Sequence, residues 1–230
     1  GVGINLLPHA IRVLTNLGLL EKLEEIAVET KELVYANRYG QFFWSEPRGR
    51  FAGYKWPQIS IHRGKLQMLL WEEANKTLDK DSVHTNTHLS AYEEHDNKII
   101  ATFIHKKTNE ILFNEEADIL IGADGINSEL RKILYPKEGE VVYSGNVLYR
   151  GTALMRPFLS AASMAMIGSL KQKMVIYPIG PELDSEGLQI INWVANIQEA
   201  DDSGIKIRDW NRRVGKEKLL TFYKNWIFEW

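Results

Sequence analysis

The stretch ADILIGADGINSELR, residues 117–131, joins an apolar run to a turn that could bind an anion. The apolar residues 119–121 predict a buried strand, and a helix is expected to begin near Asn127 or Ser128. Two glycines in the turn would let backbone approach a ligand closely, and the helix start would offer N–H groups and a positive dipole to a pyrophosphate. Asp124 could instead simply cap this helix by accepting an N–H bond.

Two further segments carry residues with binding chemistry. Arg63 opens a predicted helix, where a cation is unfavourable against the dipole, so its position favours an anionic partner. That partner could equally be a surface carboxylate or a ligand phosphate. Gly1-Val2-Gly3-Ile4 could be an ordinary turn, or a backbone segment bare enough for a flat ring to lie against it.

The hydrophobic pattern places these residues on alternating helices and strands. Helical spacing, with Pro8 at the first position and Gly18 as a break, predicts helices over residues 8–17, 20–26, 64–78 and about 217–226. Strands and turns are expected over residues 31–61, 83–104 (three short strands with a turn at 96–97), 111–122 and most of the chain after 136. Residues 198–216 are polar.

Three segments together resemble the class A FAD-dependent aromatic monooxygenases, the p-hydroxybenzoate hydroxylase-like family. They are GVGINLLPHAIRVLTNLGLLEKL at the start, SIHRGKLQMLL at 60–70 and GADGINSELR at 122–131. The similarity continues through WSEPRG, YRG, YPI and NWV, and within the family it is strongest to the phenazine-carboxylate hydroxylases of pyocyanin synthesis. The family's G-x-G-x-x-G and its later Gly-Asp block do not occur in the chain, so we expect it to be the middle of a longer enzyme.

The resemblance implies an α/β fold, the FAD-binding hydroxylase fold in incomplete form. In this fold a Rossmann-like α/β unit is interleaved with a mostly antiparallel β-sheet substrate domain. We assign residues 1–30 and 57–136 to the FAD-binding domain, and residues 31–56 and 137–230 to the β-rich substrate domain. Ligands in such architectures lie in the crevice between layers.

The resemblance also implies site residues. The expected cofactor-binding residues are Val2, Gly3, Ile4, Arg63, Leu89, Asp124 and Gly125. The expected substrate-binding residues are Tyr149, Arg150 and Tyr177, with Arg150 either the partner of a substrate carboxylate or part of a structural ion pair. No side chain is assigned a catalytic role, and no metal site is expected.

By analogy with the family, NAD(P)H reduces FAD, O₂ gives a flavin C4a-hydroperoxide, and one oxygen passes to an aromatic ring. The expected substrate is a small aromatic compound, carboxylated and phenazine- or salicylate-like. Two alternatives stay open: a flavoprotein of this fold with other redox chemistry, such as a dehydrogenase, halogenase or epoxidase, or a non-catalytic fragment used as an interaction module. An upstream G-x-G-x-x-G would favour the enzyme.

Composition narrows the class of protein. Apolar residues make up 44% and charged residues 25%, which is ordinary for a globular, cytoplasmic protein. The formal net charge of −2 argues against a nucleic-acid-binding surface, and no apolar run approaches the length of a membrane span. With no cysteine, redox chemistry must come from a cofactor. Nothing in the sequence indicates an oligomeric state.

Overall fold

The computed structural model describes residues 2–139, 142, 144–198, 213 and 215–227. Two compact units divide the chain: residues 1–71 with 143–230, and residues 72–142. The predicted domain boundaries at 30/31 and 56/57 both fall inside the first unit, so they do not coincide with a boundary between units. The division into FAD-binding and substrate domains therefore stays a prediction about function. Most of the predicted polar stretch 198–216 lies outside the described residues.

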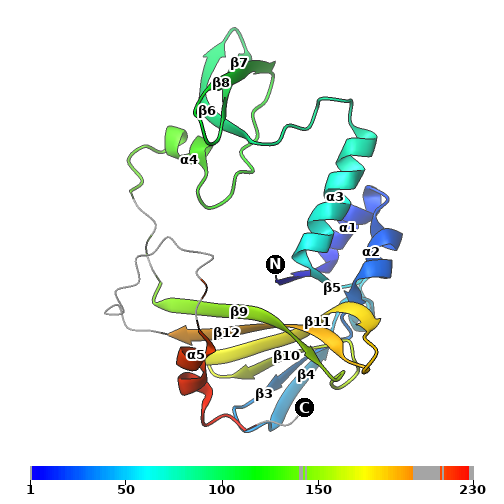
Figure 1. Cartoon of the computed structure of the whole chain (residues 1–230). Coiled ribbons are helices and arrows are strands. Elements are labelled where there is room, and N and C mark those ends of the chain that lie inside the picture. Colours follow the sequence, from blue (N-terminus) through cyan, green and yellow to red (C-terminus); the bar gives the residue numbers. More distant parts are fainter. Residues whose placement is uncertain (1, 140–141, 143, 199–212, 214, 228–230) are drawn as a thin grey trace. The chain divides into compact units, whose positions relative to one another are not determined.

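The first unit contains two sheets (Figure 1). A small antiparallel sheet has the strand order β1-β5-β2, and a larger sheet has the order β4-β3-β10-β11-β12-β9. The elements of this unit are β1 (Gly3–Leu6), α1 (Pro8–Asn16), α2 (Leu20–Ile26), β2 (Val28–Glu29), β3 (Glu32–Ala36), β4 (Phe42–Pro47), the 3₁₀ turn η1 (Gly49–Ala52), β5 (Ile59–His62), most of α3 (Arg63–Thr77), β9 (Asn146–Met155), β10 (Ser163–Gly168), β11 (Gln172–Leu183), β12 (Gln189–Gln198) and α5 (Lys216–Tyr223). Among the described residues, none of the helices combines the length and apolar character needed to cross a membrane.

Helices α1 and α2 form where the sequence predicts them. Pro8 is the first residue of α1, and Gly18 ends the helix in the left-handed conformation with φ of +72°. The Gly18 amide donates to the Thr15 carbonyl and the Leu19 amide to the Leu14 carbonyl, which is the Schellman pattern. Side chains from α1, α2, α3 and the small sheet then build one apolar core: Leu6, Ile11, Leu19, Leu23, Ala27, Ile59, Ile61 and Leu66.

Strand β5 runs directly into α3, and His62 lies at the junction. The His62 Nδ1 atom accepts a hydrogen bond of 3.1 Å from the Gly64 amide, one of the unpaired donors of the first helical turn. Burial lowers the pKa of His62 below its usual value, and the nearby charge of Lys65 lowers it further. A neutral imidazole therefore caps the helix that begins with Arg63.

The six-stranded sheet has two different faces because side chains alternate along each strand. Its cross-strand pairs include Tyr177 with Asn192, Asn192 with Thr152, and Val194 with Arg150. Residues paired in this way project to the same side of the sheet, which is here called the Tyr177 face. Its residues on β9, β11 and β12 include Arg150, Thr152, Val175, Tyr177, Asn192 and Val194. The opposite side, here the Trp193 face, is covered by α5 and buries Tyr149, Ile176, Ile191, Trp193 and Ala195.

Strand β1 docks onto the Tyr177 face through Gly3. A Cβ atom at Gly3 would lie 2.6 Å from Ile179 Cγ2, 2.8 Å from Tyr177 Cε2 and 2.9 Å from Asn192 Cβ. The Gly3 amide also donates a hydrogen bond of 2.6 Å to Asn192 Oδ1. The glycine is therefore required because any side chain would push β1 away from β11 and β12.

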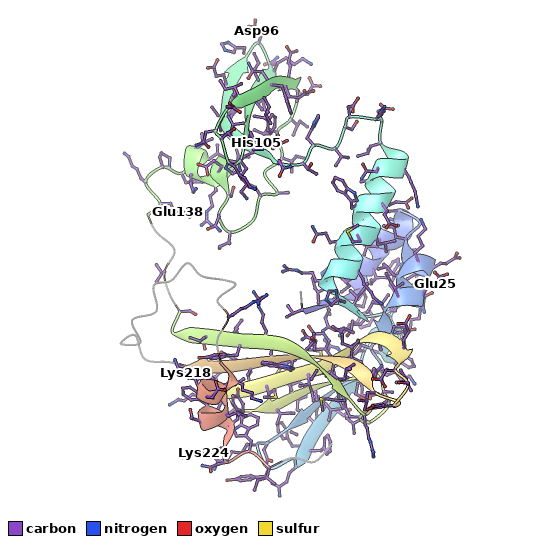
Figure 2. All side chains as sticks on the ribbon, viewed as in Figure 1. Glu25, Asp96, His105, Glu138, Lys218 and Lys224 are labelled. Atoms are coloured by element: carbon purple, nitrogen blue, oxygen red, sulfur yellow. The ribbon has the colours of Figure 1, made fainter. Side chains whose placement is uncertain are left out.

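The second unit is a three-stranded antiparallel sheet with the order β6-β7-β8 and one short helix. Its elements are β6 (Thr87–His95), β7 (Lys98–His105), β8 (Ile111–Ala117) and α4 (Glu129–Leu134). Asp96 lies at the tip of the β6–β7 hairpin (Figure 2). Asp96 and Asn97 both have positive φ, 45° and 64°, as the type I′ form of a two-residue hairpin turn requires. Residues 83–104 thus contain parts of two strands rather than the three predicted.

The predicted buried strand at residues 119–121 is wrong. β8 ends at Ala117, and Ile119 and Ile121 are 73% and 81% exposed. Among the described residues, no strand pairs with this segment. An apolar run forms a core strand only when neighbouring strands satisfy its backbone and cover its faces, so the sequence pattern alone was insufficient.

The close approach at Gly3 predicts a stability cost for any side chain there. Gly3→Ala should destabilise the protein by about 1–3 kcal/mol, typical of overpacking, and Gly3→Val by more. Chemical denaturation of the two variants and the wild type measures this series. An unchanged midpoint in Gly3→Val would show that β1 does not pack against β11 and β12 as described.

The His62 cap predicts a pH dependence. Its lowered pKa means that the stability conferred by the neutral ring is present above the unfolded value of about 6.5 and is lost as pH falls through the folded pKa. His62→Asn keeps a cap acceptor but does not titrate. Urea unfolding between about pH 7.5 and 5 should therefore show a smaller loss of stability in the variant. If both proteins lost the same free energy of unfolding over this pH range, His62 would not be the source of the pH dependence.

Candidate functional site

The structure brings four of the predicted cofactor residues together. Ile4 pairs with Ile61 across the β1–β5 ladder, and the Val2 carbonyl accepts a hydrogen bond of 3.0 Å from the Arg63 amide. Val2, Gly3 and Ile4 therefore run beside the start of α3, which carries Arg63. Gly1 lies outside the described residues.

Arg63 is exposed at the first position of α3. Of the two partners that the sequence left open, the surface carboxylate is not seen, because Arg63 forms no ion pair with the residues that the structure describes. Its guanidinium is thus available to an anion at a helix start, where the backbone dipole also favours negative charge.

Tyr177 lies beside this segment, on β11. Its side chain touches the Gly3 position and is only 6% exposed. Burial raises the pKa of the Tyr177 phenol, while a hydrogen bond with Asn5 acts in the opposite direction. Asn5 Oδ1 also accepts from Ser60 Oγ at 2.7 Å and from Gln58 Nε2 at 3.2 Å. Burial, the larger effect, therefore keeps the phenol protonated, and the phenol adjoins a polar network that extends from β1 to β5.

The three predicted substrate residues do not share one face. Arg150 and Tyr177 both lie on the Tyr177 face, separated by β12. Tyr149 points to the Trp193 face, where it is buried against Ala195, Ile197 and side chains of α5. Adjacent residues of a strand always project to opposite sides, so the pair Tyr149-Arg150 could not contribute both side chains to one surface. Its position does not support a substrate contact for Tyr149.

Asn192 is a residue of this face that the sequence did not single out. It is fully buried on β12, opposite Tyr177, and its Oδ1 holds the Gly3 amide. A signal was present: within LQIINWVANI, Asn192 interrupts an apolar strand at a buried position, where an amide needs a partner. Its role can be recognised only when β1 is known to cover this face of β12.

Asp124 and Gly125 lie in the second unit, and the hydrogen bonds that Asp124 makes stabilise the start of α4. Asp124 Oδ2 accepts from the Glu129 amide at 2.7 Å, and Ser128 Oγ accepts from the Arg131 amide at 3.0 Å. The hydrogen bond with Ser128 is the main cause that lowers the pKa of Asp124. Since α4 spans six residues and its first amides are already paired, the capping alternative accounts for Asp124. The amides of Glu129, Leu130 and Arg131 are thus already paired within the chain, and a pyrophosphate contact by this turn stays a prediction.

Gly125 has a φ of +78°, and no described atom lies within 4 Å of the point that a Cβ would occupy there. The glycine is thus explained by backbone conformation rather than by close approach. Leu89 lies on β6, an edge strand of its sheet, so one side of its backbone has no strand neighbour within the described ranges. A backbone contact of Leu89 with adenine stays a prediction, as do cofactor contacts of Asp124 and Gly125.

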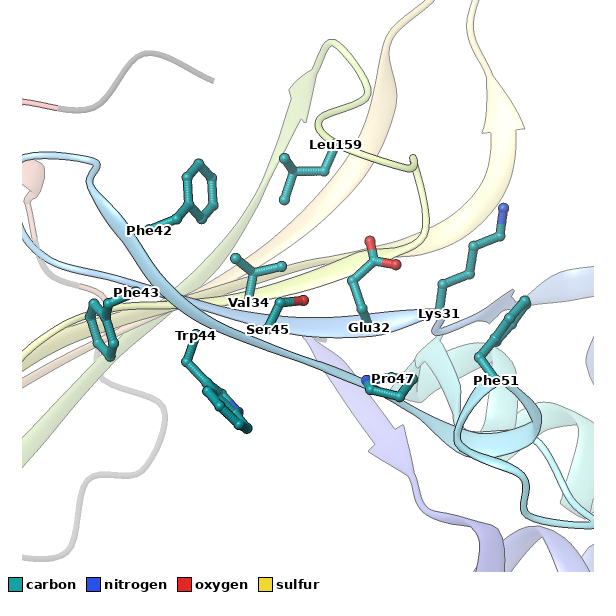
Figure 3. Close-up of a pocket in the computed structure, with 10 residues that line it drawn as sticks. All are labelled: Lys31, Glu32, Val34, Phe42, Phe43, Trp44, Ser45, Pro47, Phe51 and Leu159. Carbon is teal, nitrogen blue, oxygen red and sulfur yellow. The ribbon is translucent and has the colours of Figure 1, made fainter.

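A cavity of about 820 Å³ lies along the edge strand β4 and includes none of the predicted site residues (Figure 3). Its lining is largely apolar and aromatic: Lys31, Glu32, Val34, Phe42, Phe43, Trp44, Ser45, Pro47, Phe51 and Leu159. Phe42 and Val34 project to one side of β4, and Phe43 and Trp44 to the other, so the cavity is an open groove around an edge strand. The groove therefore lies outside the candidate site.

Sequence comparison identifies relatives of this chain. No protein-family model matches it. The phenazine 1,6-dicarboxylic acid hydroxylase PhzS of Lysobacter antibioticus is 31% identical over 231 residues, covering 100% of this chain and 57% of that protein. The 6-hydroxynicotinate 3-monooxygenase of Pseudomonas fluorescens is 28% identical over 142 residues, covering 60% of this chain and 34% of that protein. The chain thus spans little more than half of the first relative and about a third of the second.

Solved structures show the same fold. HpxO of Klebsiella pneumoniae, complexed with FAD and uric acid, matches with a TM-score of 0.73 and 18% identity, covering 98% of this chain and 53% of that one. The 2,6-dihydroxypyridine-3-hydroxylase of Arthrobacter nicotinovorans matches with a TM-score of 0.62 and 19% identity, covering 88% and 48%. The predicted FAD-binding hydroxylase fold is confirmed. This chain is thus similar in sequence to aromatic hydroxylases and monooxygenases, and it shares the fold of FAD-binding hydroxylases.

Proposed function

We propose that the natural protein is a FAD-dependent, NAD(P)H-using monooxygenase that hydroxylates a planar aromatic carboxylate. One observation carries this proposal: Gly3, in the predicted flavin segment, packs directly against Tyr177 and Asn192 on the predicted substrate sheet. Cofactor and substrate chemistry would therefore meet on one surface of the first unit. The relatives named above, both of which act on aromatic acids by name, support the same interpretation.

The residues present fit FAD. The Arg63 guanidinium, which has no ion-pair partner among the described residues, is suited to a phosphate because its planar fork can donate two parallel hydrogen bonds. The Val2–Ile4 backbone, held against β5 and β11, would border the ring system. Bound FAD, reduced by NAD(P)H, would supply the activation of O₂, a chemistry that no side chain of this chain can provide.

The protein's part would be to bind the substrate, orient it and exclude water. Arg150, exposed on β9, would pair with a carboxylate at one end of the Tyr177 face. Tyr177, buried and protonated, would donate its phenolic hydrogen to a substrate oxygen or ring nitrogen. Exclusion of water from these groups when ligands bind would limit wasteful side reactions.

The proposed reaction is tested with isotopic oxygen. The full-length natural protein should oxidise NAD(P)H faster when a planar aromatic carboxylate is present, and under ¹⁸O₂ the product should gain one labelled oxygen on the ring. Mass spectrometry of the product and an assay for H₂O₂ measure both routes. Label found only in H₂O₂ or water across a panel of benzene, pyridine and phenazine carboxylates would overturn hydroxylation and favour other redox chemistry.

The proposed role of Arg63 predicts a loss of FAD affinity. Arg63→Ala should weaken binding by about 1.5–3 kcal/mol, the range for a hydrogen bond to a charged group, or about 10- to 150-fold in Kd. Arg63→Lys should restore part of it, because lysine keeps the charge but not the planar fork. Titration of the apoprotein, followed by flavin fluorescence, gives the three affinities.

Arg50→Ala is the matched control, since Arg50 already pairs with Glu24 at 2.8 Å and with Glu29 at 3.2 Å. Its FAD affinity should equal that of the wild type. If Arg63→Ala bound FAD as tightly as this control, Arg63 would be a surface residue without a cofactor contact.

A further inference from the structure

Asn192 carries a hydrogen-bond donor that no described residue of the chain uses. Its side chain is fully buried, and its Oδ1 atom accepts the Gly3 amide at 2.6 Å. Its Nδ2 atom is shielded from solvent and has no hydrogen-bond partner in the part of the chain that the structure describes. An enclosed donor left unpaired costs about 1–3 kcal/mol, so a strand that needed only to hold Gly3 would be more stable with an acceptor alone.

The position of Asn192 indicates what could satisfy this donor. It lies on β12, the middle strand of three, with Tyr177 directly opposite on β11. Arg150 on β9 is its diagonal neighbour on the same face, about 7–8 Å away between Cα atoms. A planar aromatic acid whose carboxylate met Arg150 would extend its ring across β12. The ring atoms near Asn192 would then meet an N–H donor.

We propose that Asn192 determines substrate specificity by donating its Nδ2–H to a ring nitrogen or ring oxygen of the bound aromatic carboxylate. This rests on the proposed function. Because Oδ1 is committed to the Gly3 amide, the carboxamide cannot rotate to offer its oxygen instead, so the site reads acceptors and rejects donors at this point. Since Nδ2 is enclosed, a neighbouring side chain must move when the ligand binds.

The test compares two ligands of nearly the same shape, phenazine-1-carboxylate and anthracene-1-carboxylate, which differ by having ring nitrogens or C–H groups at the same positions. Their affinities for the FAD-loaded natural protein are measured by fluorescence or calorimetry, without turnover. The wild type should prefer the phenazine about tenfold, as one additional hydrogen bond implies. Asn192→Leu should bind both ligands equally, because it has no donor.

Asn196→Leu is the matched control, since Asn196 lies four residues along the same strand and on the same face. It should keep the preference. If Asn192→Leu does not fold, Asn192→Asp serves instead: it keeps an acceptor for the Gly3 amide and lacks the N–H donor, so it should also lose the preference.

Three results would overturn the proposal. One is a phenazine preference in the folded Asn192 variant equal to that of the wild type. Another is equal binding of the two ligands by the wild type, which would refute the role of Asn192 while leaving the proposed function intact. The third is a loss of FAD affinity in the variant with unchanged discrimination between the carboxylates, which would assign the donor to the flavin. A wild type that bound neither carboxylate nor FAD would instead refute the proposed function, and this inference with it.

Discussion

The absence of a side chain at Gly3 is the constraint on which the site depends. Ordinary contact distances leave no room for a Cβ atom between β1 and the side chains of Tyr177, Ile179 and Asn192. With glycine, the backbone of β1 comes close enough to donate its amide to Asn192 Oδ1. The same strand pairs with β5, whose end leads into Arg63. One close approach thus joins the helix start suited to an anion and the sheet face suited to an aromatic ring.

Local sequence signals predicted the elements whose stability is mostly local. Pro8 and Gly18 mark the ends of α1 because their effects act on the backbone itself, and the turn at Asp96-Asn97 follows from two residues that tolerate positive φ. The run at residues 119–121 has the composition of a core strand, yet it is exposed, because a strand needs partners that its own sequence cannot specify.

The candidate site was predictable only in part, because it too depends on contacts between segments that are distant in the sequence. Motif resemblance identified Arg63, Gly3 and Tyr177, which the structure places in one unit. It could not separate Tyr149 from Arg150, although strand alternation sends their side chains to opposite faces. It also missed Asn192, whose importance appears only when β1 is seen to lie on it. Residues that act through contacts between distant segments need the fold before they can be recognised.

The most direct measurement is a crystal structure of the full-length natural protein with FAD and phenazine-1-carboxylate. We expect the flavin ring beside Val2–Ile4 and the carboxylate ligand on the Tyr177 face, with its acid group at Arg150 and a ring nitrogen within hydrogen-bond distance of Asn192 Nδ2. A ligand bound on the Trp193 face or in the groove along β4, or a flavin remote from Gly3, would contradict it.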